Sequence, residues 1–295
     1  MKKDVIENRY DFVVFYDVEN GNPNGDPSSG NMPRIDIDTG LGYVTDVCIK
    51  RKIRDYVDRI KMDEPRFRIY IKSGASLNSK DKEAFKACGI DEKMLKSKAR
   101  EYDMLVRDWM CQNFYDIRTF GGVMTTFTKN GLNCGQIQGP VQIGFSKSVE
   151  PVYPKEITVI RDSITTEEDN KHKTTEIGRK YVIPYGLYSF RGYICPLQAK
   201  IVTGFTENDL DLLWQAIFHM FDSLALSSRG YMTVRKLIVF KHDSPYGNAP
   251  SWKLFNTVKV ERISDSSVPA RQYEDYIISI DREGIPECVE VQEMI

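Results

Sequence analysis

The stretch from Tyr10 to Tyr56 constrains the fold most, because it predicts a strand, a long polar loop and a helix in direct succession. The strand, 10–16, is dense in aromatic and β-branched residues. The loop over 19–27 joins Asn-Gly, Asn-Pro, Asn-Gly and Asp-Pro pairs, and each pair is a turn signal. The helix over 45–59 carries four cations: Lys50, Arg51, Lys52 and Arg54. Amide and backbone donors beside a cationic helix suit a phosphate chain better than a small apolar ligand.

The predicted helix has one buried face and one basic face. Apolar residues recur at helical spacing and predict the buried stripe: Ile49, Ile53, Val57 and Ile60. Lys50 and Arg54, four residues apart, share a neighbouring face. On an isolated helix such a face is more often ordinary solvated surface, whereas the adjacent loop of asparagines and glycines favours contact with a nucleic-acid backbone.

The next segments predict a second strand and then a helical insertion. Phe67–Ile71 alternates in character, so a β-α-β unit would close near its end. Residues 73–134 look helical and insert-like, with helices expected over 81–87 and 94–114. Residues 117–122 place an aromatic side chain beside two glycines. That pattern is typical either of a turn at a strand end or of a backbone that approaches another molecule closely.

Residues 157–183 predict an extended hairpin with a polar tip. Both ends are strand-like, and the tip over 167–173 is charged and polar. Such a hairpin has little core of its own, so we expect it to lean on another body. The alternative is a disordered surface loop.

The rest of the chain predicts further strands around one clear helix. Strands are expected over 141–145, 185–194, 234–241, 255–260 and 276–280. A capping box at Thr206 opens a helix with a broad apolar face over 210–224, and the acidic tail is expected to be peripheral. We therefore predict an α+β fold with two β-α-β halves on one sheet. This is a modified ferredoxin-like core with large insertions. RNA-recognition modules have the same core, but the fold alone does not assign a function.

Composition places limits on the partners. The chain has 295 residues, of which 41% are hydrophobic and 28% charged, so it can bury a sizeable core. The formal net charge is −1, so a nucleic-acid site has to be a local basic patch. This balance argues against a free-standing, non-specific nucleic-acid binder.

Cysteine usage and the apolar runs indicate a cytoplasmic protein. None of the six cysteines forms a C-x-x-C pair, so we expect reduced thiols, no disulfide framework and no zinc site. The charged segment 1–7 has no apolar core of a signal peptide. No apolar run approaches the ~20 residues that a membrane span needs.

Catalytic and cofactor motifs are not apparent, so we expect no catalytic residue, no metal and no cofactor. The three histidines fit no nucleophile–base arrangement, and the Gly-rich nucleotide motifs are missing. The loop after Asn20 resembles a calcium loop only faintly, because Asn31 stands where a bidentate glutamate is needed. Asp36 and Asp38 leave open phosphodiester cleavage with a metal, although solvated or capping aspartates are the more common case.

Long segments of the chain resemble the Cas-seven backbone subunits of type I-C CRISPR Cascade, a Csd-type family within the RAMP superfamily. The resemblance is carried by the residues over 10–27 (YDFVVFYDVENGNPNGDP) and over 42–54 (GYVTDVCIKRKIR). It resumes at 184–188, at 204–206 and at 235–242 (RKLIVFKH). These segments span most of the chain.

The resemblance implies a non-enzymatic protein of CRISPR antiviral defence. Such subunits bind crRNA along its phosphate backbone, polymerise head to tail and displace a nucleotide at regular intervals. Target DNA then pairs with the exposed guide, and a recruited helicase-nuclease cuts it. The implied partners are crRNA, target DNA through the guide, copies of the chain itself and the other type I-C Cascade subunits.

The resemblance also implies a single domain with a palm, fingers and a thumb. The palm would comprise about 8–72, 135–150 and 184–282, the fingers about 73–134 and the thumb about 151–183. Candidate RNA contacts lie in the first loop, the basic helix, the double-glycine segment and a glycine loop: Asn20, Asn22, Asn24, Arg34, Thr45, Lys50, Arg51, Arg54, Thr119, Phe120, Gly121, Gly122, Ser228, Arg229 and Gly230. Candidate contacts in the thumb are Arg161, Lys171, Lys173 and Arg179.

Two other functions stay open at this point. One is a metal-dependent endoribonuclease of the same superfamily that uses Asp36 or Asp38, although neither closely matches the cleaving aspartate of type III relatives. The other is a purely structural assembly protein that does not bind RNA.

Overall fold

Strand β1 (Tyr10–Gly21) lies inside an eight-stranded sheet with the order β14-β11-β1-β10-β8-β4, in which β7 and β9 pair additionally with β10. The computed structural model describes residues 4–62, 64–90, 99–124, 127, 135–161, 176–222, 230–263 and 267–294. β1 is paired along its length, antiparallel, with β10 (Glu176–Ile194) and with β11 (Tyr231–His242).

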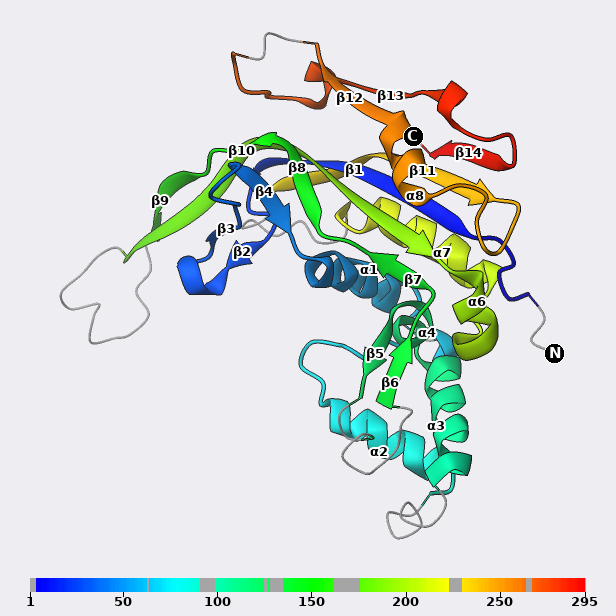
Figure 1. The fold of residues 1–295 in the computed structure, drawn as a ribbon. Helices are drawn as coiled ribbons and strands as arrows, with labels where there is room; N and C mark the ends of the chain where they lie inside the picture. The colour runs from blue at the N-terminus through cyan, green and yellow to red at the C-terminus, as the bar shows by residue number, and fades with distance from the viewer. Residues whose placement is uncertain are drawn as a thin grey trace, which may run out of the picture.

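The remaining strands extend this sheet on both sides. β10 also pairs, antiparallel, with β7 (Val141–Ile143), β8 (Ser146–Pro151) and β9 (Lys155–Arg161). The two edges are β4 (Leu41–Val44) and β14 (Val289–Met294). β9 and the first part of β10 form an arm that projects from the sheet, at the left of Figure 1.

Two helices cover one face of the sheet. α1 (Asp46–Ile60) begins at Thr45, whose side chain accepts a hydrogen bond from the Cys48 amide, and α7 (Glu207–His219) begins with a capping box at Thr206. Both predicted helix starts are therefore confirmed. Apolar residues of both helices form one buried core with the facing side chains of β1 and β10: Phe12, Val14, Tyr16, Ile49, Ile53, Val57, Phe190, Leu213 and Ile217.

The other face of the sheet carries a second core. It is covered by α8 (Ser251–Thr257) and by the hairpin of β12 (Val258–Arg262) and β13 (Tyr276–Ile280), which lies above the sheet in Figure 1. The strand predicted over 276–280 is confirmed. The strand predicted over 255–260 is wrong in its first half, because Leu254 and Phe255 enter this core from a helix.

A third core belongs to a lobe below the sheet (Figure 1). The lobe contains α2 (Leu77–Ala87), α3 (Ala99–Asn113), α4 (Tyr115–Phe120), β5 (Gly121–Val123) and β6 (Gln136–Gln138). The helical character predicted for this insertion is confirmed. Short elements complete the described chain: β2 (Gly25–Asp26), η1 (Pro27–Ser29), β3 (Met32–Pro33), η2 (Pro65–Phe67), α6 (Pro196–Gln198), η5 (Ala199–Thr203), η7 (Tyr273–Asp275) and η8 (Arg282–Gly284).

The strand predicted over 67–71 is wrong. Phe67 ends η2, and Arg68 makes only an isolated bridge with Phe114. The alternation in this segment has another cause: Ile69 enters the core under the sheet while Tyr70 enters the core of the lobe. The strands that follow α1 in the main sheet are β7 and β8, which lie beside β10.

The C-terminal tail is part of the sheet. β14 pairs with β11 from Leu237↔Met294 to His242↔Val289, so the acidic tail forms an edge strand. Lys236 and Arg282 both contact Glu293, and these contacts lower the pKa of its carboxyl. Among the residues described, no helix is long and apolar enough to span a membrane.

Candidate nucleic-acid interface

The first polar loop is tied to the start of α1 by one asparagine. The Asn24 Oδ1 atom accepts hydrogen bonds from the Thr45 amide at 3.1 Å and from the Thr45 hydroxyl at 3.2 Å. The same hydroxyl caps α1 by accepting from the Cys48 amide at 3.3 Å. Asn24 and Thr45, both predicted site residues, therefore lie together where the positive end of the helix dipole meets the loop.

A second close approach brings Asn20 and Gly230 together. Both have left-handed backbones, with φ of 48° at Asn20 and 67° at Gly230. A Cβ atom on Gly230 would lie 2.5 Å from the Asn20 carbonyl oxygen, so only glycine fits there. The predicted glycine loop thus reaches the predicted asparagine loop, although Ser228 and Arg229 lie outside the described residues.

Other side chains of the loop hold its own shape. Asn22 is buried and donates to the Asn31 carbonyl at 2.7 Å. The Arg34 guanidinium pairs with Asp26 at 3.1 Å and is about three-quarters buried. These contacts stiffen the loop, which is a precondition for presenting Asn20 and Asn24 in fixed positions.

The cations of α1 do not form a bare basic face. Lys50 pairs with Asp46 at 2.9 Å and Arg51 with Asp55 at 2.6 Å, both one turn away on the same helix. Both cations stay partly exposed, so a phosphate can compete for them.

Arg54 is different, because its guanidinium is buried. It donates to Asp116 of α4 at 2.9 Å, and the same carboxylate accepts from the backbone amides of Tyr70 and Ile71. Its side chain is 7% exposed and that of Asp116 is fully buried. The structure therefore gives Arg54 a structural role, which joins α1 to the lower lobe, in place of a solvent-facing phosphate contact.

The double-glycine segment also turns inward. Thr119 and Phe120 are buried, and the Phe120 ring lies beneath the Lys50 and Arg54 cations at 5.9 and 5.3 Å. Gly121 has φ of 74°, and a Cβ there would lie 2.1 Å from the Ile137 carbonyl oxygen of β6. The close approach at Gly121 is thus to its own chain, as in the turn alternative, and Gly122 follows it in β5.

The arm carries apolar residues that sequence reasoning did not single out. Ile157, Val159, Ile160 and Ile177 are 42%, 44%, 66% and 69% exposed. Their β-branched character was visible in the sequence, but only the structure shows that no second layer formed by the described residues covers them. Arg179, 71% exposed, lies 3.4 Å from Glu156, whereas Lys171, Lys173 and the Arg161 side chain fall outside the described residues.

The proposed nuclease pair forms a turn. Asp36 accepts hydrogen bonds from the Asp38 amide and the Thr39 hydroxyl, at 3.2 and 2.9 Å. Its carboxylate therefore caps the turn before β4. Within the described ranges, no cluster of three His, Cys, Asp or Glu side chains has the arrangement of a metal site.

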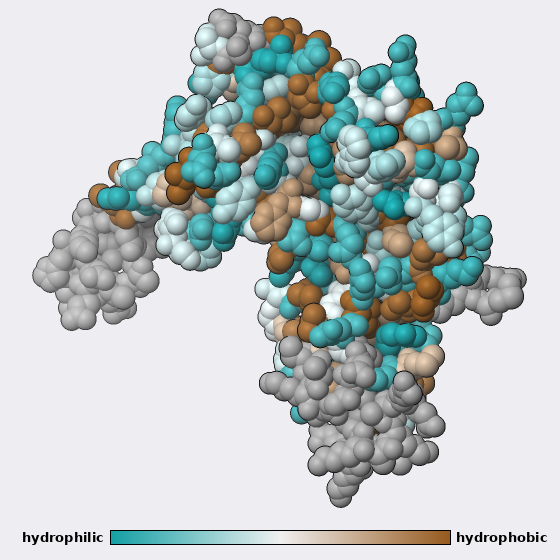
Figure 2. All heavy atoms as spheres, in the orientation of Figure 1, coloured by the Kyte–Doolittle hydropathy of each residue, from teal (hydrophilic) through white to brown (hydrophobic). Residues whose placement is uncertain are grey.

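The loop, the α1 start and the arm surround one hollow of the molecule. In Figure 1 the β2–β3 loop and α1 lie between the arm at the left and the lobe below. The space-filling outline in Figure 2 is indented at that place. Asn24, Thr45 and Lys50 therefore belong to elements that border a concave surface, whose shape suits a strand of nucleic acid passing between arm and lobe.

Comparison with known proteins gives one family and several distant structures. The family model described as "CRISPR-associated protein Cas7" matches residues 8–281. A CRISPR-associated protein Cas7 from Haloferax volcanii is 26% identical over 92% of this chain and 81% of its own length.

Solved structures match at lower identity. A chain of a CRISPR RNA-guided surveillance complex in a pre-nicking state is 12% identical, with a TM-score of 0.47 over 79% of this chain and 78% of that chain. A chain of another CRISPR RNA-guided surveillance complex is 11% identical, with a TM-score of 0.45 over 79% of this chain and 68% of that chain.

Proposed function

The chain belongs to the Cas7 family of CRISPR-associated proteins, and from this premise we propose that it is a backbone subunit of a Cascade-like surveillance complex. It binds crRNA independently of sequence, along the phosphate backbone, and presents the guide for pairing with target DNA. The observation that carries the proposal is the family match over 8–281, which takes in nearly all of the described fold.

The hollow beside the α1 start is the proposed guide site. Phosphates there meet the positive end of the α1 dipole, the exposed loop residue Asn20 and the partly exposed Lys50 and Arg51. None of these groups reads a base, so the same surface accepts any guide. Arg34 and Gly230 support the loop from either side.

The proposed parts of the subunit follow the three cores. The sheet with α1 and α7 is a modified ferredoxin-like palm, since β11, β1, β10 and β8 have the order 4-1-3-2 of that fold when counted along the chain. The lobe of α2, α3 and α4 forms the fingers, and the β9–β10 arm is the thumb. The N-terminal motif over 10–27 favours subtype I-C.

The exposed apolar arm supports head-to-tail assembly. Isoleucines and valines are exposed on both faces of the projecting hairpin, because Ile160 pairs with Ile177 on one face and Ile157 and Val159 lie on the other. They need a second body to cover them, and the next copy along the guide supplies that body. Such a contact is heterologous and open, so it makes a filament whose length the guide and the end subunits limit. Catalysis is left to a recruited helicase-nuclease.

The test is the salt dependence of guide binding. In the double variant Lys50→Ala/Arg51→Ala, we expect weaker binding to every guide sequence, and a slope of log K against log salt reduced by about 0.7 per lost contact. Fluorescence anisotropy with two unrelated guides measures both. The control is Lys61→Ala/Lys72→Ala, which removes two cations, each paired with an acid, at the far end of α1. If wild type and both double variants had the same salt slope, the proposed guide site would be wrong.

A further inference from the structure

The face of the sheet opposite α1 and α7 is only partly covered. On β10 the side chains of this face are those of Tyr185, Leu187, Ser189, Arg191 and Tyr193, since the alternate residues enter the core under the helices. α8 and the β12–β13 hairpin cover the neighbouring strands β1 and β11, where Val13, Phe15, Ile238 and Phe240 are buried. Over β10 the cover still takes in Tyr185 and Leu187, which are buried, whereas Arg191 and Tyr193 further along the strand are exposed.

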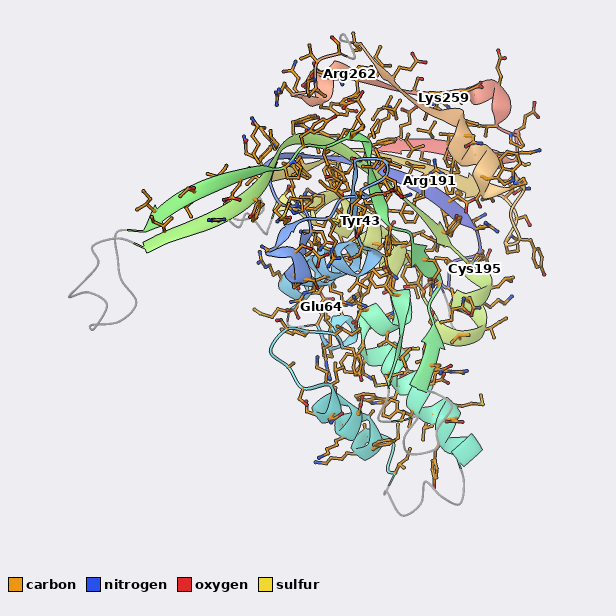
Figure 3. The ribbon with its side chains drawn as sticks, turned by 60° about the vertical axis from the view of Figure 1, so that its left-hand side comes forward. Tyr43, Glu64, Arg191, Cys195, Lys259 and Arg262 are labelled. Atoms are coloured by element: carbon orange, nitrogen blue, oxygen red, sulfur yellow. The ribbon has the colours of Figure 1, made fainter. Side chains whose placement is uncertain are left out.

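The uncovered part is lined by aromatic rings and cations. The Arg191 guanidinium and the Tyr193 ring lie against Phe255 of α8, at 5.1 and 5.7 Å, and both remain exposed on their outer sides. Register places Lys147 of β8 opposite Ser189 and Tyr43 of β4 opposite Lys147. Tyr43 and Arg191 are labelled in Figure 3.

An aromatic pair completes the surface at the sheet edge. The Phe145 and Tyr43 rings stack at 6.4 Å with an angle of 5° between their planes. Phe145 is 55% exposed and Tyr193 is 41% exposed. Two aromatic surfaces with cations between them thus lie on one sheet face.

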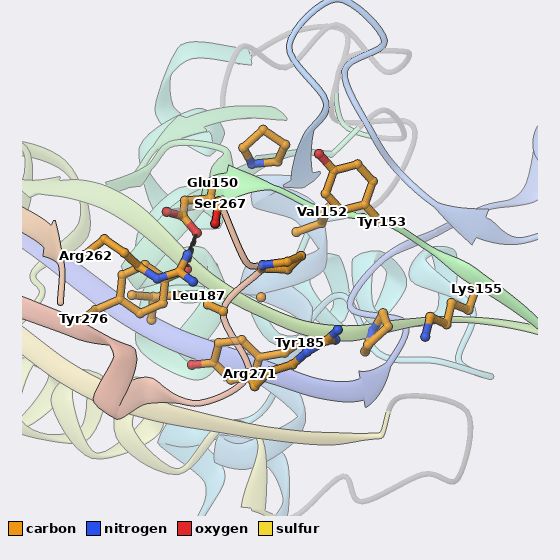
Figure 4. Close-up of a pocket in the computed structure, with 15 residues that line it drawn as sticks. Glu150, Val152, Tyr153, Lys155, Tyr185, Leu187, Arg262, Ser267, Arg271 and Tyr276 are labelled. Carbon is orange, nitrogen blue, oxygen red and sulfur yellow. Dashed lines mark hydrogen bonds and ion pairs between the residues drawn. The ribbon is translucent and has the colours of Figure 1, made fainter. Parts of the chain in front are cut away.

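A pocket of about 460 Å³ continues the same row along β10. Tyr185 and Leu187 form its floor, and Tyr153, Lys155 and Arg271 lie around it in Figure 4. Tyr153 is 66% exposed. We call the whole surface the β10 strip: Tyr43, Phe145, Lys147, Tyr153, Lys155, Arg191, Tyr193 and Arg271.

The β10 strip carries four cationic side chains that form no ion pair with a described residue. Lys147, Lys155, Arg191 and Arg271 are exposed, and none of them pairs with a carboxylate of the described residues. Three acids of this face are engaged by other cations: Asp11 by Arg9 and His242, Asp17 by Arg235, and Glu150 by Arg262. Asp275 accepts from the backbone amide of Arg271. This local excess stands out in a chain whose net charge is −1.

Exposed rings interleaved with unpaired cations match single-stranded nucleic acid. Bases stack on aromatic side chains while Lys and Arg neutralise phosphates, and the sheet face opposite the helices is where RNA-recognition modules stack bases. An acidic peptide would use the cations but leave the rings without a specific role. A duplex hides its base faces.

We propose that the β10 strip holds a single strand of DNA, namely the strand displaced when the guide pairs with its target. This inference rests on the proposed function. The pocket end of the strip lies where Tyr185 pairs with Glu19, at the start of the polar loop that borders the guide site. From there β10 runs for about 26 Å to Tyr193, at about 3.3 Å per residue, on the face away from α1. A displaced DNA strand that leaves the guide can follow β10 on this face without crossing the guide.

The test uses the assembled complex, co-expressed with guide RNA and the other subunits. Lys147→Glu/Arg191→Glu is compared with Lys253→Glu/Lys259→Glu, which makes the same charge change at exposed lysines of α8 and β12, outside the eight-stranded sheet. The probe is a labelled single-stranded DNA without complementarity to the guide. We expect the strip variant to bind it at least about tenfold more weakly, with a salt slope lower by about 1.4, and the control variant to bind it as wild type.

A second readout follows the displaced strand itself. With a matching duplex target, permanganate reactivity of the displaced thymines should rise in the strip variant and in Phe145→Ala/Tyr193→Ala, but not in the control. The proposal would be overturned if the strip and control variants bound the probe with equal affinity. It would also be overturned if native mass spectrometry showed that the strip variant had lost a protein subunit while its DNA binding was unchanged. The guide RNA content of the same samples is also measured. Wild-type complexes that contain no RNA would refute the proposed function and not the proposed DNA site alone.

Discussion

Two buried arginines join the parts of the molecule at the scale of single residues. Arg54 of α1 is bound to Asp116 of α4, and Arg118 of α4 is bound to Asp209 of α7 at 2.7 and 2.9 Å. All four side chains are at least nine-tenths buried. The links run from α1 through the lobe to α7, the two helices that cover one face of the sheet, so an unpaired charge at any of these groups would cost much stability.

We predict that Arg54→Ala destabilises the protein by about 3–5 kcal/mol, because it leaves the Asp116 carboxylate buried with only two backbone amides as partners. Urea unfolding measures the loss. Arg51→Ala breaks a half-exposed pair and should change stability by less than about 1 kcal/mol. If Arg54→Ala were as stable as Arg51→Ala and bound guide RNA more weakly, the structural role assigned to Arg54 would be wrong.

Asp209 gives a prediction for pH. Burial raises the pKa of its carboxyl, but the hydrogen bonds and charge of Arg118 and the Thr206 cap outweigh this, so the pKa lies below its usual value. A lowered pKa in the folded state contributes stability that is complete above the unfolded value of about 3.9 and is lost as the pH falls through the folded value.

We therefore expect Asp209→Asn to be less stable than wild type near neutral pH, and the difference between the two proteins to shrink as the pH falls below about 4. Urea unfolding at a series of pH values measures this difference. A constant gap down to the acid limit would show that the side chain acts through the cap alone.

At the scale of elements, the sequence predicted the helices whose starts are set by local caps. α1 and α7 were predicted with their starts, since Thr45 and Thr206 are local caps that need no tertiary information. Residues 67–71 were misread because their alternate side chains enter two different cores, which no local pattern reveals.

The candidate site divides in the same way. The asparagine loop was predicted from turn signals and the helix from 45 onward from its apolar spacing, and the structure brings Asn24 onto Thr45 and Asn20 onto Gly230. The burial of Arg54 could not be predicted, because its partner Asp116 is 62 residues away in the sequence. The exposed side chains of the β10 strip likewise depend on where the α8 cover ends.

The arm gives a prediction at the same scale. Ile160→Asp/Ile177→Asp replaces two exposed residues that are paired in register, so the fold of the monomer should survive. We expect shorter assemblies on guide RNA, measured by light scattering across a size-exclusion peak. Ile263→Asp, at a residue 60% exposed directly after β12, is the control and should assemble normally. Full-length assemblies from the arm variant would refute the proposed contact.

At the scale of the whole molecule, stability should be unevenly distributed. β1 is paired on both sides and covered on both faces, whereas β9 pairs with β10 alone and carries exposed side chains. We predict that the amides of β1 exchange with deuterium only on global unfolding, and that those of β9 exchange at least about a hundredfold faster in the free protein. Hydrogen-exchange mass spectrometry measures both, and equal protection would contradict this distribution.

The pairing of β1 has a consequence for synthesis on the ribosome. Val14 pairs with Phe190 and Leu237, and β11 pairs in turn with β14 at Met294, so the sheet cannot close until these distant segments have been translated. The lobe core draws on residues 70–137 and can form while the rest of the chain is still being made. At about 5–20 residues per second, the apolar face of β1 waits roughly ten seconds or more for its partners. The nascent chain is thus a client for chaperones, and a late truncation should yield insoluble protein with an intact lobe.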